Sequence, residues 1–145
     1  MPPADTLPNA AFIDDPGVVS DKLLDSLSVL LPPAPLSLAF RHNFNLQASS
    51  EDPNLGYDGS VLELSSDGGN TFQDILAAGG SFFMGGYNRT ISTDRGNPIA
   101  GREALERQLG RFYHDRGEST SDSDFWQASL ADGQRYQRFE RRLAR

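Results

Sequence analysis

Residues 65–72, with the sequence SSDGGNTF, have the residue types and spacing of a tight hydrogen-bonded turn. They fit the Asp-box pattern S-x-D-x-G-x-T-[WF] at every fixed position, which here are Ser65, Asp67, Gly69, Thr71 and Phe72. An aspartate at the third position can accept backbone N–H hydrogen bonds across the turn, and a glycine at the fifth can adopt a positive φ. Because the turn itself uses these side chains, we predict a structural role for the motif rather than direct contact with a sugar.

Acidic side chains in the first half of the chain are candidate ligands for calcium. Ca²⁺ prefers hard oxygen ligands and takes about six to eight of them. No EF-hand spacing is present, and acidic residues near strand ends are usually solvated, so a calcium site and a solvated surface both stay open. The candidate ligands are Asp14, Asp15, Asp21 and Asp58, with Asp25 and Glu63 as further acidic residues.

Patterns for nucleophilic catalysis are absent from the sequence. The two histidines are His42 and His114, no serine lies in a G-x-S-x-G context, and the chain has no cysteine. A catalytic triad or a histidine-ligated metal would need two such groups brought together. We therefore predict that the chain is not an enzyme. Asn88 begins the sequon N-R-T, which has a meaning only in a eukaryotic secretory pathway.

Length and charge exclude further classes. The chain has 145 residues and a net charge of −7, which suits one domain and argues against a nucleic-acid partner, because such binding relies on clustered Lys and Arg. No apolar run reaches the roughly 18 residues that a membrane-spanning helix needs. The start, MPPADTLPNA, has neither a basic region nor an apolar core, so it predicts no signal peptide.

Short strands and glycine turns are expected to position these residues up to about residue 101. Residues 36–40 alternate between large apolar and small side chains, which is the period of a strand with one buried face. Residues 61–76 have the pattern of a strand, a glycine turn and a second strand, and two more short apolar pieces follow between glycine pairs. Evenly spaced short strands of this kind predict an antiparallel β-sandwich.

The sequence changes character after residue 101. Residues 1–101 contain 4 Lys+Arg against 12 Asp+Glu, whereas residues 102–145 contain 9 Arg against 8 Asp+Glu and no Val, Ile or Pro. Apolar residues in this tail recur at the spacing of one helical face, at Leu105, Leu109, Phe112 and Tyr113 and more weakly at Tyr136, Phe139 and Leu143. These spacings predict two amphipathic helices, separated by a loose polar segment.

Five segments of the chain together resemble one known family: PNAAFIDDPGVVSDKLLDS, LAFRHNFNL, YDGSVLELSSDGGNTFQDILAAGGSF, GGYNRTIS and NPIAGREA. They resemble the jelly-roll accessory domains, related to MAM and reelin-type β-sandwiches, that recur in large secreted or surface-anchored bacterial proteins, often beside proteases. The resemblance covers roughly residues 8–104. It implies an extracellular or cell-surface module without catalytic activity, used for adhesion, for contact with a protein or carbohydrate, or for spacing. Some relatives bind calcium.

The resemblance ends near Ala104. Members of the family continue with W-S-G and a Thr/Val-rich strand, whereas this chain has LERQLGRFYHDRGEST. Read one nucleotide later with permitted codons, residues 105–122 can give WSGNSGGFITTVVNLPA and residues 137–145 can give SDSSEGWR, both parts of the ending that the family implies. This match indicates a single-nucleotide frameshift near Ala104. A genuine helical C-terminal extension is the alternative.

The expected organisation has three parts: a flexible N-terminus at residues 1–10, an incomplete jelly-roll-like antiparallel β-sandwich at residues 11–101, and a frameshifted helical or disordered tail at residues 102–145. Loss of the closing strands predicts unpaired sheet edges, marginal stability and aggregation. Three functions stay open. They are a non-catalytic extracellular module that contacts a surface ligand or neighbouring domains, a remnant of a secreted multidomain protease or other enzyme, and a small interaction protein that uses its helical tail.

Overall fold

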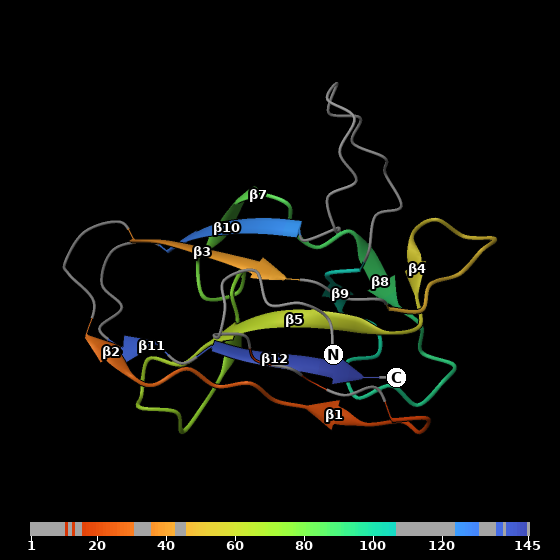
Figure 1. The fold of residues 1–145 in the computed structure, drawn as a ribbon, viewed down its shortest axis with the longest axis horizontal. Helices are drawn as coiled ribbons and strands as arrows, with labels where there is room; N and C mark the ends of the chain where they lie inside the picture. The colour runs from red at the N-terminus through yellow and green to blue at the C-terminus, as the bar shows by residue number, and fades with distance from the viewer. Residues whose placement is uncertain are drawn as a thin grey trace.

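The computed structural model describes residues 11, 13, 16–30, 36–42, 46–106, 124–130, 136–137 and 139–144, and no helix occurs among them. The mainly β fold class predicted from the sequence is thereby confirmed. The strands (Figure 1) are β1 (Asp21–Lys22), β2 (Val29–Leu30), β3 (Leu36–His42), β4 (Leu55–Gly56), β5 (Gly59–Leu64), β6 (Gln73–Asp74), β7 (Ser81–Met84), β8 (Arg89–Ile91), β9 (Glu103–Ala104), β10 (Asp124–Leu130), β11 (Tyr136–Gln137) and β12 (Phe139–Ala144).

These strands pair into small sheets. The largest has the order β1-β12-β5-β6, two others have the orders β3-β10-β7 and β4-β8-β9, and the last pairs β11 with β2. The pairs are antiparallel except for β4 with β8, which is parallel. Figure 1 shows β3, β10 and β7 on one side of β5 and β12. The framework therefore has two layers over part of its length.

β5 is buried along its whole length, and each of its faces packs against a different apolar cluster. Successive side chains of a strand point to opposite faces, so Val61 and Leu62 join different clusters. The two clusters are Val61, Ile91, Ile99 and Ala104 on one face, and Leu62, Leu64 and Ile75 on the other. Covering both faces of one strand is what brings the surrounding segments together.

The second layer packs on the face of β5 that carries Leu62. Leu36, Leu38 and Phe40 of β3 are half-buried against this cluster, and β7 contributes Phe82. The residues between the three apolar positions of β3 are exposed. The alternation predicted for this strand is therefore confirmed.

The helical tail expected for residues 102–145 stays a prediction, because the structure describes only parts of this segment. The spacing of Tyr136, Phe139 and Leu143 predicts a helix, but the described residues here have an extended backbone in β11 and β12. β12 pairs with β5 along its whole length, and its last two residues, Leu143 and Ala144, also pair with β1. A short helix has little stability of its own, and these pairings outweigh a weak helical period.

The other predicted helix begins at Leu105, which is extended instead. Leu105 forms an antiparallel bridge with Ser60 of β5, and its side chain is buried. The buried framework continues to Glu106. The rest of that predicted helix falls on residues 107–123, which lie outside the described residues, as does the predicted flexible N-terminus at residues 1–10.

Gly59, at the start of β5, has no room for a side chain. An alanine Cβ would lie 2.5 Å from Ile91 Cδ1 and 2.7 Å from Ala104 Cβ. We therefore predict that Gly59→Ala lowers the free energy of unfolding by about 1–3 kcal/mol, because overpacking forces the neighbouring groups to shift. Gly17→Ala is the matched control, since nothing lies within 4 Å of its Cβ position. Urea denaturation followed by circular dichroism measures both, and equal stabilities of the two variants would contradict the packing at β5.

Candidate functional site

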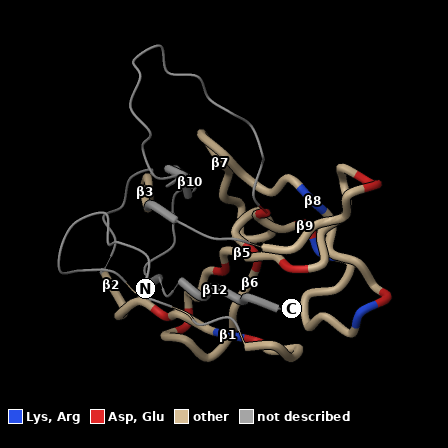
Figure 2. Tube along the Cα trace, turned by 45° about the vertical axis from the view of Figure 1, so that its right-hand side comes forward, with Lys and Arg blue, Asp and Glu red and all other residues tan. Residues whose placement is uncertain are grey.

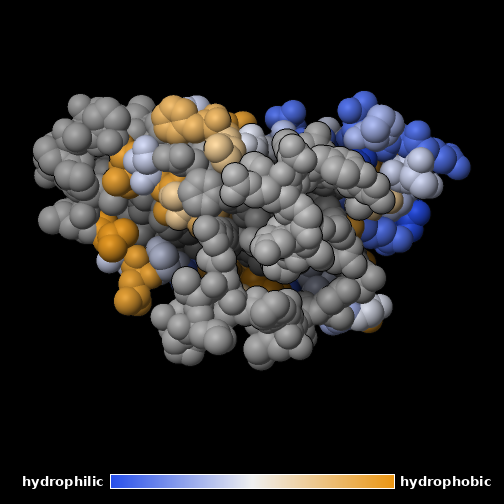
Figure 3. Space-filling view, turned by 45° about the horizontal axis from the view of Figure 1, so that its top comes forward, coloured by the Kyte–Doolittle hydropathy of each residue, from blue (hydrophilic) through white to orange (hydrophobic). Residues whose placement is uncertain are grey.

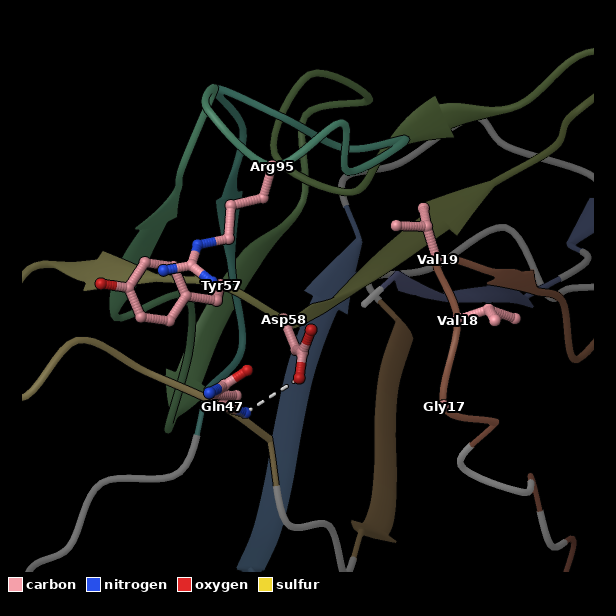
Figure 4. A pocket seen from close by; sticks show the side chains of 7 residues that line it. All are labelled: Gly17, Val18, Val19, Gln47, Tyr57, Asp58 and Arg95. Carbon is pink, nitrogen blue, oxygen red and sulfur yellow. Dashed lines mark hydrogen bonds between the residues drawn. The ribbon is translucent and has the colours of Figure 1, made fainter.

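A shallow pocket lies where the N-terminal segment passes the turn that leads into β5 (Figure 4). Its volume is about 230 Å³. It is lined by Gly17, Val18, Val19, Gln47, Tyr57, Asp58 and Arg95. The lining combines two aliphatic side chains, an aromatic ring, an amide, a carboxylate and a guanidinium, which is a mixture suited to binding a small polar ligand with apolar faces.

Asp58 is the most buried side chain of the pocket, with only 5% of its surface exposed. The backbone N–H of Gln47 donates to Asp58 Oδ2 at 3.1 Å. In return, the backbone N–H groups of Tyr57 and Asp58 donate to the carbonyl oxygen of Gln47 at 2.8 Å and 3.0 Å. Figure 4 shows the Asp58 carboxylate between the Tyr57 ring and the segment that holds Val18 and Val19. The turn before β5 is thus fixed by its own hydrogen bonds with the carboxylate at the pocket.

Arg95 and Tyr57 form one rim of the pocket. The Arg95 guanidinium lies 4.1 Å from the centroid of the Tyr57 ring, within the range of a cation–π interaction. Asn97 Nδ2 donates to the carbonyl oxygen of Tyr57 at 2.8 Å, and Asn97 Oδ1 accepts from the N–H of Ile99 at 2.9 Å. Asn97 therefore ties the loop after β8 to the turn before β5, and this brings the ring and the guanidinium together.

The four predicted calcium ligands do not share one described site. Asp58 lines the pocket, Asp21 is exposed in β1, and Asp14 and Asp15 lie outside the described residues. Among the residues that the structure describes, no group of three or more His, Asp and Glu side chains is arranged to hold a metal ion. Calcium binding therefore stays a prediction.

The turn that links β5 to β6 is held by Asp67. Its Oδ1 accepts hydrogen bonds from the backbone N–H groups of Asn70 at 3.0 Å and Thr71 at 2.9 Å. The hydroxyl groups of Ser65 and Thr71 donate to the same carboxylate, each at 2.7 Å. Gly69 has a φ of 90°, and its N–H donates to Ser65 Oγ at 2.8 Å. These hydrogen bonds set the path of the chain from one strand to the next.

The same hydrogen bonds lower the pKa of Asp67 well below its ordinary value. The backbone N–H of Thr71 is the largest cause, followed by the hydroxyl groups of Thr71 and Ser65. Each donor favours the ionised carboxylate over the neutral acid. Phe72, the last residue of the motif, is half-buried. The Asp67 carboxylate is engaged inside the turn that leads from β5 to β6.

A polar network lies beside β5. Arg102 donates to Glu63 Oε1 at 2.5 Å and to Asp74 Oδ2 at 2.9 Å. The Tyr87 hydroxyl donates to Asp74 Oδ2 at 2.9 Å and accepts from the backbone N–H of Leu62 at 3.0 Å. Burial raises the pKa of Tyr87, which keeps the phenol protonated. Burial opposes the charge of Arg102, but its bonds to Glu63 and Asp74 outweigh this effect and raise the pKa of Arg102.

A second polar cluster lies at Glu106, beside β8. Asn88 Nδ2 donates to the carbonyl oxygen of Glu106 at 2.6 Å, and Asn88 Oδ1 accepts from the N–H of Glu106 at 2.8 Å. Arg89 Nε lies 2.6 Å from Glu106 Oε2 in an ion pair. The side-chain amide of Asn88, the asparagine of the N-R-T sequon, therefore donates to and accepts from the backbone of Glu106, as the backbone of a paired strand residue would.

Sequence reasoning did not identify Tyr57, Arg95 or Arg102 as site residues. The acidic partners of Arg102 are 39 and 28 positions away in the chain, so no local pattern joins them. One signal was available for Arg95: residues 1–101 contain only 4 Lys+Arg against 12 Asp+Glu, so each cation there is a candidate for a specific contact. The signal does not extend to Arg102, which begins the arginine-rich tail.

Comparisons with models of protein families, with curated proteins and with solved structures give no match for this chain. Within the described part of the chain, no helix is long and apolar enough to span a bilayer. The function of the pocket must therefore be argued from its own geometry.

We predict that Asp67→Asn lowers the melting temperature at neutral pH, because an amide cannot accept the set of hydrogen bonds that the carboxylate accepts. The pKa of Asp67 is lower in the folded chain than its ordinary value of 3.8. Its contribution to stability is therefore present above about pH 4 and is lost as the pH falls through the folded-state pKa.

Thermal melts at neutral pH and at about pH 4 and about pH 2 test this linkage. The gap in melting temperature between wild type and Asp67→Asn should be constant above pH 4 and should narrow below it. Glu51→Gln, at an exposed position, is the control and should show no gap at any pH. A gap for Asp67→Asn that persists unchanged to the lowest pH would rule out the carboxylate as its cause.

Proposed function

We propose that this chain is a non-catalytic β-sandwich module of an extracellular protein, and that it contacts a surface ligand through the pocket beside β5. The observation that carries the proposal is that the ion pairs of the framework join its own segments to one another. Arg102 binds Glu63 and Asp74, and Arg89 binds Glu106, so these groups hold segments of the framework together. A catalytic site would instead aim such groups at a nucleophile or a substrate.

The pocket supports contact with a ligand that has both hydroxyl groups and apolar faces. Arg95 is exposed on the ring of Tyr57, and the carboxylate of Asp58 lies beside them. Val18 and Val19 add exposed aliphatic surface on the opposite wall. This is the chemistry of a carbohydrate, whose ring faces are apolar and whose rim is polar. The same rigid framework would also space neighbouring domains of a larger protein.

We also propose that the residues after Ala104 come from a single-nucleotide frameshift, so that the parent module closed its jelly roll with other strands. Two observations support this: the family-like ending in the neighbouring frame, and the loss of Val, Ile and Pro after residue 101. Leu105 and Glu106, the first two residues that the shift would change, are buried. The frameshifted sequence would therefore begin within the packed domain and not after its last buried residue.

The nucleotide sequence from codon 100 onward tests the frameshift. We expect the frame one nucleotide later to encode W-S-G directly after Ala104 and a Thr/Val-rich strand beyond it. A chain restored to that frame should melt cooperatively and at a higher temperature than the present chain. Nucleotides that cannot encode those strands in the neighbouring frame would end the proposal.

An array of immobilised oligosaccharides tests the contact function. We expect the wild-type chain to bind a subset of the array, and we expect Tyr57→Ala and Arg95→Ala to weaken that binding about tenfold or more. Glu51→Ala, an exposed residue that does not line the pocket, is the control and should bind as wild type does. Measurements in CaCl₂ and in EDTA show whether the predicted calcium site contributes. Binding that both pocket variants retain, or release of sugar from the array, would contradict a non-catalytic contact through this pocket.

A further inference from the structure

β7 is the longest edge strand of the described framework that contains no charged residue. Residues 75–88 contain no Asp, Glu, Lys, Arg or His, although the chain as a whole has a net charge of −7. Figure 2 shows the described tube around β7 without charged residues, whereas the segments near β8 carry them. Figure 3 shows hydrophobic side chains gathered at the end of the molecule that holds β2, β3 and β7, and hydrophilic side chains at the opposite end.

β7 lies at the edge of its sheet and presents apolar side chains there. It pairs with β10 on one side, and no described strand pairs with its other side. Phe82 points inward, where its ring meets that of Tyr87 edge to face at a centroid distance of 5.1 Å. Phe83 and Met84 point outward and are 66% and 55% exposed. A register shift between Gln127 and Ala128 leaves Phe83 as the extra residue of a β-bulge, and bulges commonly re-aim a side chain in this way.

We propose that β7 is the contact surface between two copies of this chain, which pair their β7 strands antiparallel across a two-fold axis. An edge strand offers unpaired N–H and C=O groups, and charged residues are a common device that stops a second chain from pairing there. Three other edge strands carry such charges: β1 has Asp21 and Lys22, β6 has Asp74, and β9 has Glu103. β7 has none.

The charge balance makes β7 the place where a second copy meets the least electrostatic opposition. Two molecules with a net charge of −7 repel each other, so they associate best where neither contributes a charge. Pairing β7 with β7 places only Ser, Phe and Met opposite one another. In a two-fold arrangement the same patch serves both partners, which brings Phe83 of the two copies close to the axis.

The contact area sets the strength of this dimer. A contact between two four-residue strands, each with two exposed apolar side chains, buries much less accessible surface area than the roughly 1,200 Å² of a stable interface. The dimer should therefore be weak and should form only at high protein concentration. Added salt should strengthen it, because salt screens the repulsion between like-charged copies and leaves the apolar contact in place.

Sedimentation velocity from about 10 μM to about 1 mM, at low and high NaCl, tests the proposal with the full chain. We expect a monomer–dimer equilibrium that salt shifts toward dimer, and an increase of about tenfold or more in the dimer Kd for Phe83→Lys. Leu27→Lys is the control, because Leu27 is 88% exposed and lies outside the strands. It should leave the Kd unchanged. Circular dichroism melts establish that both variants fold.

The absence of cysteine from the chain allows a second, independent measurement. Phe83→Cys should form a disulfide-linked dimer under mild oxidation, whereas Leu27→Cys at the same concentration should stay largely monomeric. A chain that remains monomeric at every concentration would overturn the proposal. So would a dimer that Phe83→Lys leaves intact, or equal cross-linking at positions 83 and 27.

Discussion

Glu63 places a carboxylate in the buried strand β5, and its ion pair with Arg102 offsets the cost of burying that charge. An isolated buried charge would cost several kcal/mol, so its partner has to be held close. Arg102 also binds Asp74, and Asp74 accepts a hydrogen bond from Tyr87. One guanidinium therefore couples β5, β6 and the segment that enters β9. This coupling adds polar contacts between β5 and β6 to the apolar packing of the central sheet.

Tyr87 links this network to the hydrophobic core. Its ring packs against both apolar clusters, while its hydroxyl bonds to the backbone of Leu62 and to Asp74. The candidate pocket is built at the other end of the same strand, because Asp58 directly precedes β5. A change in the backbone position of β5 would therefore also move Asp58, which lines the pocket. This link runs along one strand and needs no direct contact between the pocket and the ion pairs.

Local features of this framework could be predicted from sequence, and long-range ones could not. The alternation at residues 36–40 predicts which side chains of β3 meet the core, and the spacing of residues 65–72 predicts the hydrogen bonds of the turn. Tyr57 and Arg95 meet only because Asn97 joins two loops, which no local pattern encodes. The helical tail expected from residues 136–143 stays a prediction; the residues described there pair as extended strands with β5 and β1, contacts that a local period does not encode.

The bond between Asn88 and the backbone of Glu106 has a practical consequence for producing this chain. Secretion from a eukaryotic host exposes the N-R-T sequon to the glycosylation machinery before folding is complete. A glycan on Asn88 Nδ2 would replace one of its protons and place a bulky sugar against Glu106, which is buried. The glycosylated chain would then lose a hydrogen bond that ties Asn88 to Glu106. Cytoplasmic bacterial expression avoids this competition, so material from the two hosts should not be treated as the same sample.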